Sequence, residues 1–343
     1  MLNQELGGVA LVGAGSAAPQ AVLDNGGLER RVETSDEWIT TRTGIRRRHL
    51  AAPGESLTDL AELAGRRALA MAQMEAADLD LILLATSTPD DLFGSAARVQ
   101  GQLGATRAVA FDLTAACSGF VFGLVTAAQF LRTGVFRNVL LIGADLMSRW
   151  VDWDDRRTCI LFGDGAGAVV IRRSDRDRLL GFEMRSDGTQ NSSLNLNFQA
   201  QARSLDPATA VDGSPLAVAL GTYQTVAMNG PEVYRFAVRR VPEAIEKALF
   251  KANRTAEDLD WLLLHQANQR IVDAVAQRLN IPPEKVLGNL CEHGNTSAAS
   301  IPLALDAAVR DGRVKPGDAI ATAGFGAGLS WGAAVFEWGD DRA

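Results

Sequence analysis

Three side chains in this sequence have the types and settings needed for acyl-transfer chemistry: Cys117, His265 and Asn295. Cys117 stands among small residues, Ala115-Ala-Cys-Ser-Gly119, at the start of an apolar stretch that predicts a buried helix. The positive end of a helix dipole favours a thiolate, whereas apolar burial opposes it. A nucleophilic role requires the helix terminus and a polar partner to outweigh burial. The alternative is a buried, inert cysteine.

His265 and Asn295 each allow two interpretations. His265 follows the apolar run Trp261–Leu264, so it is either a satisfied core histidine or a neutral imidazole that exchanges a proton in a cleft. Asn295 opens a predicted helix, as an N-cap or as an amide that donates a hydrogen bond to a developing oxyanion. Cys291-x-His293 lacks two further ligands at suitable spacing, so we expect no metal.

The glycine-rich segments do not predict a nucleotide fold. Pro19 interrupts what should be a helix after Gly13-Ala-Gly15, and a strand rather than a helix follows Gly163–Gly167. Gly324–Gly328 is expected instead to bring a backbone N–H close to a substrate, because glycine tolerates strained turns.

The charge of the chain also narrows its function. A net charge of -7 opposes general nucleic-acid binding. The one basic run, Arg42 with Arg46-Arg47-Arg48, is typical of a solvated surface turn. It could also clamp a phosphate-bearing ligand. His49, next in the chain, is expected at the surface.

Short apolar strands alternate with amphipathic helices, which predicts an α/β protein. One helix opens at the capping box Ser56-Leu-Thr-Asp59 and runs to about Met74, and another runs from about Pro231 to Lys251. Strands are predicted at Val9–Val12, Leu81–Leu84, Val139–Ile142, Ala168–Ile171, Leu262–Leu264 and Ala319–Ala323.

An internal repeat relates the two halves of the chain. Ala77–Ala85 matches Glu257–His265, and Gly163–Gly167 matches Gly324–Gly328. Between these markers each half carries a small-residue helix, a glycine turn and a strand. We therefore predict a duplicated α/β unit, residues 1–178 and 179–343, packed as one body. The chain of 343 residues also exceeds the roughly 250–300 residues at which a single core stops growing.

Other signals concern the compartment. The sequence has no apolar stretch long enough for a transmembrane helix and no signal-peptide pattern at its start. Its three cysteines are far apart and odd in number. We expect a cytoplasmic protein without disulfides or membrane association.

Several long motifs, in order, resemble the β-ketoacyl-acyl-carrier-protein synthase III family of the thiolase superfamily over nearly the whole chain. They are Thr34–Arg46, Ala115–Gly119, Phe162–Gly167, His265–Asn268, His293–Ser300 and Gly324–Gly332. The resemblance implies a thiolase-like fold with α-β-α-β-α layers. It also implies an enzyme that joins acetyl-CoA, or a short acyl-CoA, to malonyl-acyl-carrier-protein with loss of CO2 and CoA.

The resemblance also implies roles for single residues. Cys117 accepts the acyl group, while His265 and Asn295 support malonyl decarboxylation. The backbone N–H groups of Cys117 and Ala327 form an oxyanion hole, although the family often carries glycine where Ala327 stands. The resemblance further implies a coenzyme A site formed by Trp38, Arg42, Arg156, Tyr234, Ala267 and Asn268. It implies that Gln266 and Arg270 dock the carrier protein and that Phe93 lines the acyl pocket. The segment Ser186–Pro215 is expected to form a loop over the mouth of the substrate tunnel.

The same resemblance implies a homodimer that needs no cofactor beyond its coenzyme A thioester substrate. Polyketide-type and specialised starter synthases share the Cys-His-Asn set and remain alternatives. Another is a non-catalytic binder of acyl-CoA or carrier protein. Thiolases place a second cysteine in the C-terminal glycine loop, and Gly324–Gly328 has none.

Overall fold

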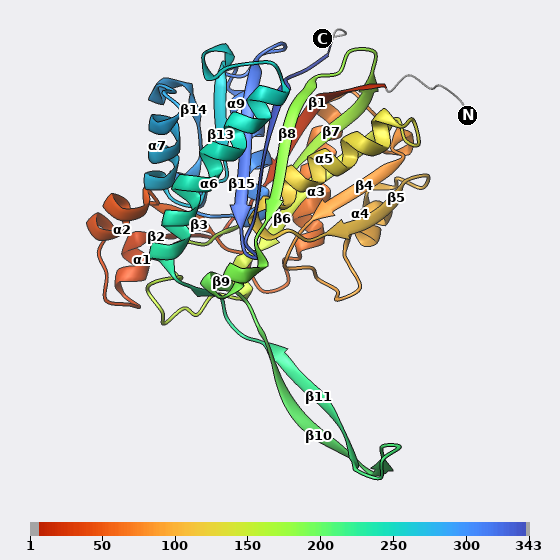
Figure 1. Cartoon of the computed structure of the whole chain (residues 1–343), viewed down its shortest axis with the longest axis vertical. Helices are drawn as coiled ribbons and strands as arrows, with labels where there is room; N and C mark the ends of the chain where they lie inside the picture. Colours follow the sequence, from red (N-terminus) through yellow and green to blue (C-terminus); the bar gives the residue numbers. More distant parts are fainter. Residues whose placement is uncertain (1–6, 341–343) are drawn as a thin grey trace.

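Two five-stranded sheets with the same strand order form the framework of the protein (Figure 1). The computed structural model describes residues 7–340, except for the side chains of residues 206–208. The first sheet has the order β1 (Gly8–Ala17), β7 (Asp164–Ser174), β6 (Asn138–Leu146), β4 (Leu81–Ala85) and β5 (Val109–Leu113). The second has the order β8 (Leu179–Ser186), β16 (Ser330–Glu337), β15 (Ala319–Gly326), β13 (Trp261–Leu264) and β14 (Val286–Leu287). All six predicted strands are confirmed.

The helices form three layers around these sheets. The central helices α5 (Gly119–Arg132) and α9 (Ser300–Arg310) lie between the sheets and contact strands of both. Helices α3 (Leu57–Met71) and α4 (Ala96–Leu103) cover the outer face of the first sheet. Helix α6 (Gly230–Lys251) covers that of the second sheet, and α7 (Gln269–Arg278) shares its hydrophobic core. The predicted α-β-α-β-α architecture of two duplicated halves is confirmed.

Helix α3 has the predicted start, and the turn after its end is repeated in the second half. The capping box of α3 is present: the Ser56 hydroxyl accepts a hydrogen bond from Asp59 N at 3.1 Å, and the Asp59 carboxylate accepts one from Ser56 N at 3.3 Å. Helix α3 ends at Met71, earlier than predicted, and Gln73 beyond it has a left-handed φ of 51°. Asn253 has a φ of 52° at the equivalent place after α6. Each turn leads into a buried strand, β4 or β13.

Smaller elements border one end of the body. They are β2 (Val22–Asp24), β3 (Arg47–His49), α1 (Asn25–Glu29), α2 (Asp36–Thr43) and α8 (Leu290–His293). Here the expectation of a solvated basic turn is wrong in part. Arg42, Arg46 and Arg47 are exposed, but Arg48 is fully buried and donates to Asn25 Oδ1 at 2.9 Å and to Ile160 O at 2.7 Å. Burial lowers the pKa of Arg48 to about 10.

The predicted surface position of His49 is also only half right. His49 is partly buried, and its ring stacks on His293 with the centroids 4.8 Å apart. Both histidines belong to the packing between β3 and α8.

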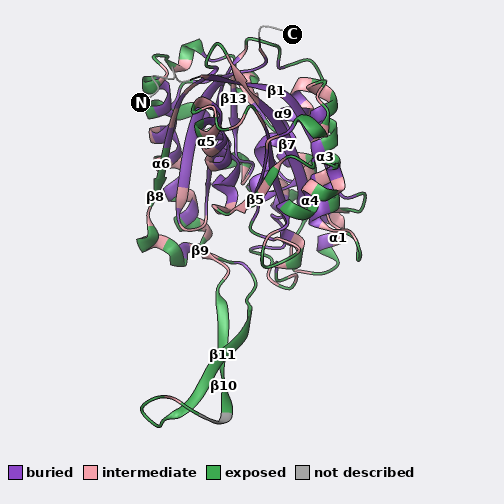
Figure 2. Cartoon of the chain, turned by 90° about the vertical axis from the view of Figure 1, so that its right-hand side faces the viewer, coloured by how far each residue is buried: buried purple, intermediate pink, exposed green. Residues whose placement is uncertain are grey.

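A long hairpin stands where the sequence predicted a loop over the tunnel mouth. Strands β10 (Phe198–Thr209) and β11 (Pro215–Tyr223) pair only with each other and extend away from the body (Figure 1). Every residue of β11 is exposed (Figure 2). The short strands β9 (Leu194–Asn195) and β12 (Ala227–Met228) pair at its base. The segment therefore projects from the body, and only its base approaches the cavity described below.

Candidate active site

Cys117 lies in a one-turn 3-10 helix, Ala116–Ser118, between β5 and α5. Its neighbour Ala116 has a left-handed φ of 47°, and Cys117 itself is 8% exposed. The end of β15 packs directly on this turn. A Cβ added to Gly326 would lie 2.8 Å from Cys117 N, and one added to Gly324 would lie 3.1 Å from Cys117 O. Glycine at both places allows the two halves of the molecule to meet at the thiol.

Asn295 reaches the same place through Ser297. Asn295 Oδ1 accepts a hydrogen bond from Ser297 N at 2.9 Å, and the Ser297 hydroxyl donates to Cys117 Sγ at 3.4 Å. The bond from Ser297 N closes a local turn around Thr296, and the predicted N-cap role of Asn295 is wrong, because Thr296 is the N-cap of the 3-10 helix Ser297–Ala299 and Ala299 is that of α9. Because its oxygen is occupied, the Nδ2 hydrogens are the donors it can offer to a ligand, as the other interpretation requires. The main chain of Asn295 pairs with Leu161 and Gly163 of the first half.

His265 follows β13 and is 1% exposed. Its Nδ1 lies 2.7 Å from the hydroxyl of Ser300, the first residue of α9, and its ring packs edge-on against Phe325. Burial lowers the pKa of His265 to about 3. The imidazole is therefore neutral at physiological pH and can act as a hydrogen-bond donor or acceptor without carrying charge.

Two short segments bring the three predicted residues together. Gly324-Phe325-Gly326 contacts Cys117 through its glycines and His265 through its phenylalanine. The 3-10 helix Ser297–Ala299 contacts Cys117 through Ser297, and the start of α9 contacts His265 through Ser300. The sulfur and the imidazole therefore both contact the end of β15, and the Asn295 carboxamide is connected to the sulfur through Ser297.

A cavity of about 830 Å³ opens onto Cys117. Ser297 and Ala327 lie in its wall beside Cys117, whereas His265 and Asn295 do not line it. Much of the remaining wall is apolar: Leu92, Phe93, Ala97, Ala110, Phe111, Met147, Trp150, Phe162, Leu194, Leu196, Tyr223 and Val226. Such a lining suits an acyl chain attached to the sulfur.

The thiol is electrostatically disfavoured as an anion in the free protein. Burial, together with the charge of Asp145, raises the pKa of Cys117 to about 12, and the hydrogen bond from Ser297 opposes this rise. The expected gain from the helix terminus therefore does not outweigh burial, since Cys117 precedes the first turn of α5. A proton acceptor is needed before this sulfur can attack.

The residues predicted to bind coenzyme A fall into two groups. In the first, the Trp38 ring has the guanidinium of Arg42 at 4.7 Å and that of Arg156 at 5.1 Å from its centroid. Arg156 also donates to Glu33 O at 2.7 Å. This arrangement offers a flat aromatic surface with two cations beside it, a setting suited to an adenine ring and phosphates.

The second group lies at the start of α7. Asn268 caps this helix by accepting a hydrogen bond from Arg270 N at 2.9 Å, and Ala267 next to it is half-buried. The guanidinium of Arg270 lies 5.6 Å from the centroid of the Tyr234 ring. Arg270 is exposed, as docking of an acidic protein requires.

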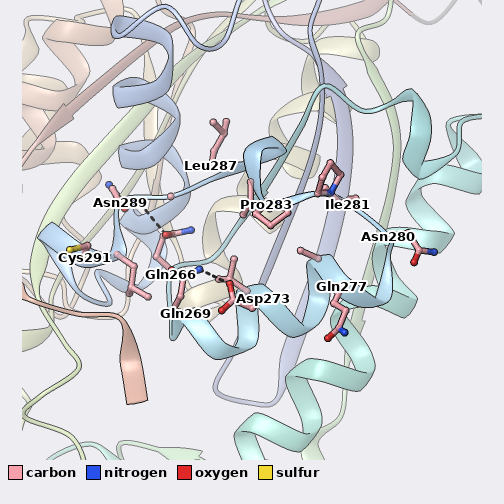
Figure 3. A pocket seen from close by; sticks show the side chains of 16 residues that line it. Gln266, Gln269, Asp273, Gln277, Asn280, Ile281, Pro283, Leu287, Asn289 and Cys291 are labelled. Atoms are coloured by element: carbon pink, nitrogen blue, oxygen red, sulfur yellow. Dashed lines mark hydrogen bonds between the residues drawn. The ribbon is translucent and has the colours of Figure 1, made fainter. Parts of the chain in front are cut away.

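The structure contradicts the expectation that Gln266 docks the carrier protein. Gln266 is 2% exposed, its Nε2 donates to Leu264 O at 2.7 Å, and its Oε1 accepts from Asn289 N at 3.1 Å. Figure 3 shows this side chain within a separate pocket between α7 and the 281–291 segment. A side chain with both ends used inside the protein offers nothing to an incoming partner.

Sequence reasoning did not single out Ser297 or Asp145. Ser297 stands inside the quoted motif His293–Ser300, and its contact with Cys117 follows only from the fold. Asp145 lies near the carboxyl end of β6, where α/β sheets commonly place functional groups. That position is the signal that could have identified it.

The described part of the chain contains no group of three or more His, Cys, Asp or Glu side chains arranged to hold a metal. Within the same residues, no helix is both long and apolar enough to cross a bilayer.

Comparisons with known proteins identify the family of this chain. The family 3-oxoacyl-[acyl-carrier-protein] synthase III matches residues 111–188, and its C-terminal domain matches residues 249–338. Beta-ketoacyl-[acyl-carrier-protein] synthase III of Trichormus variabilis is 67% identical over 97% of this chain and 98% of its own, and that of Acaryochloris marina is 64% identical over 98% and 99%.

Solved structures agree as well. The 3-oxoacyl-[acyl-carrier-protein] synthase III of Aquifex aeolicus has a TM-score of 0.87 and 43% identity, covering 96% of this chain and 100% of its own. The priming beta-ketosynthase of the R1128 polyketide pathway has a TM-score of 0.88 and 34% identity over 99% of both chains. This chain therefore belongs to the β-ketoacyl-[acyl-carrier-protein] synthase III family and is a thiolase-fold condensing acyltransferase that initiates fatty-acid synthesis.

Proposed function

We propose that Cys117, His265 and Asn295 carry out a two-stage condensation. Cys117 Sγ attacks the thioester carbon of acetyl-CoA or a short acyl-CoA, and CoA leaves with a proton. Malonyl-acyl-carrier-protein then enters and loses CO2. The resulting enolate attacks the acyl-cysteine, which gives 3-oxoacyl-acyl-carrier-protein. The observation that carries this proposal is that Cys117 and His265 contact the end of β15 while Asn295 is connected to Cys117 through Ser297.

The neutral His265 and the Nδ2 group of Asn295 are proposed to stabilise the enolate oxygen formed as CO2 departs. Both groups can donate without charge, and both are nearly excluded from water, which strengthens such hydrogen bonds. The backbone N–H groups of Cys117 and Ala327 are proposed as the oxyanion hole for the tetrahedral intermediates. Support comes from Cys117 and Ala327 lining one cavity. No metal or redox group enters this scheme.

Substrate binding is proposed to use the two groups beside α2 and α7. Trp38, Arg42 and Arg156 would hold the nucleotide end of coenzyme A, while Tyr234, Ala267 and Asn268 would line the path of the pantetheine arm. Arg270 would contact the acidic carrier protein. The exposed cations around Trp38 support the assignment of the nucleotide end, and the exposed guanidinium of Arg270 supports its contact with the carrier protein.

We further propose a homodimer, because apolar groups gather at one unpartnered edge. Strand β5 ends the first sheet with Val109 52% and Phe111 39% exposed, and the nearby Phe93 is 99% exposed although it lines the Cys117 cavity. An exposed apolar strand edge is a template for association. A second copy packed there would receive Phe93 at its own acyl cavity.

The projecting hairpin supports the same homodimer. One face carries four cross-strand pairs without a charge: Phe198–Tyr223, Ala200–Gly221, Ala202–Ala219 and Ser204–Ala217. A two-stranded hairpin is marginal in water without a surface to pack on. Tyr223 at its base lines the cavity that also reaches Phe93 and Phe111, so the hairpin and the β5 edge border one region.

Two broader assignments belong to the same proposal. Residues 1–178 and 179–343 are taken as the two halves, with Cys117 in the first and His265 and Asn295 in the second. The cytoplasm is the proposed location, supported by three cysteines that are all free thiols, as in a reducing compartment.

Mass spectrometry of the protein after mixing with acetyl-CoA tests the first half-reaction. We expect one acetyl group on Cys117, absent in Cys117→Ala. A binder without catalytic activity would gain no acetyl group. His265→Ala and Asn295→Ala should damage malonyl decarboxylation more than acetylation. Equal loss of both half-reactions would refute the division of roles between Cys117 and the other two.

The structural likeness to the R1128 priming ketosynthase keeps one alternative substrate in view. Competition among acetyl-, butyryl- and branched acyl-CoA primers with malonyl-acyl-carrier-protein separates a fatty-acid initiator from a specialised starter enzyme. We expect the short unbranched primers to prevail. Preference for a longer or branched primer would favour the specialised role.

A further inference from the structure

One buried carboxylate beside Cys117 has no part in the mechanism above. Asp145, near the end of β6, is fully buried and contacts two separate segments. Its Oδ1 accepts hydrogen bonds from Thr86 Oγ1 at 3.1 Å, Ser87 N at 2.8 Å and Thr88 Oγ1 at 2.9 Å. Its Oδ2 accepts from Ala298 N at 3.2 Å. The two oxygens therefore differ: Oδ1 has three donors, and Oδ2 faces the residues that precede α9.

Ser297 connects this carboxylate to the nucleophile. Its hydroxyl donates to Cys117 Sγ at 3.4 Å, and the N–H of the next residue, Ala298, donates to Asp145 Oδ2 at 3.2 Å. Hydrogen bonding from the Ser297 side chain also opposes the rise in the pKa of Asp145. A serine hydroxyl has one hydrogen and can accept as well as donate. It cannot donate to the sulfur and to the carboxylate at once. Donation to the sulfur is the arrangement in the structure, and donation to the carboxylate is the one that proton transfer would require.

The backbone at Ser297 is held in an unusual conformation. Its φ of 51° lies in the left-handed region, which costs a residue other than glycine about 1–2 kcal/mol. Such strain persists where the surroundings fix it, commonly at functional sites. Here Asn295 Oδ1 accepts from Ser297 N, and Asp145 Oδ2 accepts from Ala298 N. These two bonds hold the Ser297 hydroxyl between Cys117 and Asp145.

We propose that Asp145 is the proton acceptor for Cys117 and that the Ser297 hydroxyl relays the proton. The Cys117 S–H proton passes to Ser297 Oγ while the Ser297 O–H proton passes to Asp145 Oδ2, which leaves a thiolate, a hydroxyl and a carboxylic acid. The thiolate forms the new C–S bond, and the C–S bond to CoA breaks. The reverse relay returns the proton to the departing CoA sulfur and restores the carboxylate. The proposal rests on Cys117 being the nucleophile.

Burial gives the acceptor suitable basicity. It raises the pKa of Asp145 above the ordinary range of a carboxyl group, so the protonated state is accessible. Proton transfer would also remove the negative charge that otherwise opposes a thiolate at Cys117.

Alkylation of Cys117 by iodoacetamide at pH 7 in the purified full chain tests the relay, because it follows thiolate formation and needs no condensation. A purely electrostatic role for Asp145 predicts faster alkylation in Asp145→Asn, since a repelling charge is lost. The relay predicts the opposite sign. We expect alkylation and acetyl-CoA acylation to fall by about 10²-fold, the lower end of general-base contributions. Faster or unchanged alkylation in a folded Asp145→Asn variant would overturn the proposal.

Ser297→Ala provides a second variant, because Asp145→Asn loses a buried acceptor and could fail to fold. It removes the hydroxyl and leaves the carboxylate, and we expect a similar loss of alkylation. Ser118→Ala is the matched control: Ser118 is equally buried next to Cys117, but its hydroxyl donates to Ala115 O at 2.6 Å and takes no part in the relay. Wild-type alkylation in Ser297→Ala, or an equal loss in Ser118→Ala, would count against the relay. If the wild-type protein is alkylated at Cys117 by iodoacetamide but is not acetylated by acetyl-CoA, the proposed function is refuted instead.

Discussion

Substituting Gly326 by alanine tests the contact that brings the two halves together at the thiol. The added Cβ would lie 2.8 Å from Cys117 N and 3.0 Å from Cys117 Cβ. Ordinary van der Waals contact begins at about 3.4 Å, so the end of β15 and the Cys117 turn must separate by about 0.6 Å. Both neighbours are parts of a fixed turn and not the tip of a flexible side chain. The strain cannot be relieved by a rotamer change.

Two effects of different size are expected from Gly326→Ala. Overpacking of this kind costs about 1–3 kcal/mol of stability, which should lower Tm by roughly 2–10 °C. The displaced atom is the Cys117 backbone N–H, a proposed oxyanion donor. Misplacement by about 1 Å can cost roughly 10²-fold, so we expect acetylation of Cys117 to slow by about 10- to 10²-fold. The rate should therefore suffer more than the fold.

Stopped mixing with acetyl-CoA followed by mass spectrometry measures the acetylation rate, and thermal unfolding measures the stability. Gly101→Ala is the matched control, because Gly101 lies within α4 with no atom within 4 Å of an added Cβ. It should keep the wild-type rate and gain about 0.5–1 kcal/mol from the better helix former. Wild-type acetylation and unchanged Tm in Gly326→Ala would show that the close contact at Cys117 does not exist.

Three further predictions concern stability, substrate binding and assembly. Burial lowers the pKa of His265 to about 3 and that of His293 to about 4. Between about pH 6.5 and these values, each histidine is protonated in the unfolded chain and neutral in the folded protein. Each therefore lowers the free energy of unfolding by about 1.4 kcal/mol for every pH unit of acidification in that range. Urea unfolding at pH 7.5 and 5.5 should show this loss of stability, and the loss should be smaller in His265→Gln. An equal loss in the wild type and in the variant would contradict a neutral, buried His265. Trp38→Ala should raise KM for acetyl-CoA by about 3- to 10-fold, the worth of one aromatic stack, with kcat unchanged in steady-state assays; an unchanged KM would remove Trp38 from the coenzyme A site. The double variant Ala202→Glu, Ala219→Glu places two facing carboxylates on the uncharged side of the hairpin. Sedimentation should then give the 36.5 kDa monomer, whereas the control Gln201→Glu, on the opposite side, should remain dimeric. A dimeric double variant would exclude the hairpin from the interface.

The sequence alone determined the parts of this protein that depend on local pattern. Capping residues at Ser56 and Asp59, continuous apolar runs such as Leu81–Leu84, and the repeated markers around Gly163 and Gly324 fix elements whose cause lies within a few residues. The repeat also predicted two similar sheets, because equal patterns fold into equal units. Cys117, His265 and Asn295 were candidates by their types and their places at the ends of elements, and the resemblance to the family favoured a catalytic role over the structural alternatives.

Tertiary structure decided what depends on neighbours far along the chain. Arg48 and Gln266 look like surface residues in sequence, yet each is buried and forms a hydrogen bond with the backbone of a distant segment. Burial raises the pKa of Cys117, although its place near a helix start predicted a lower one. The extent of this burial depends on how the second half of the chain covers the turn. Ser297 and Asp145 acquired their relation to Cys117 in the same way: residues 117, 145 and 297 meet only when the two halves pack, and no local pattern encodes that contact.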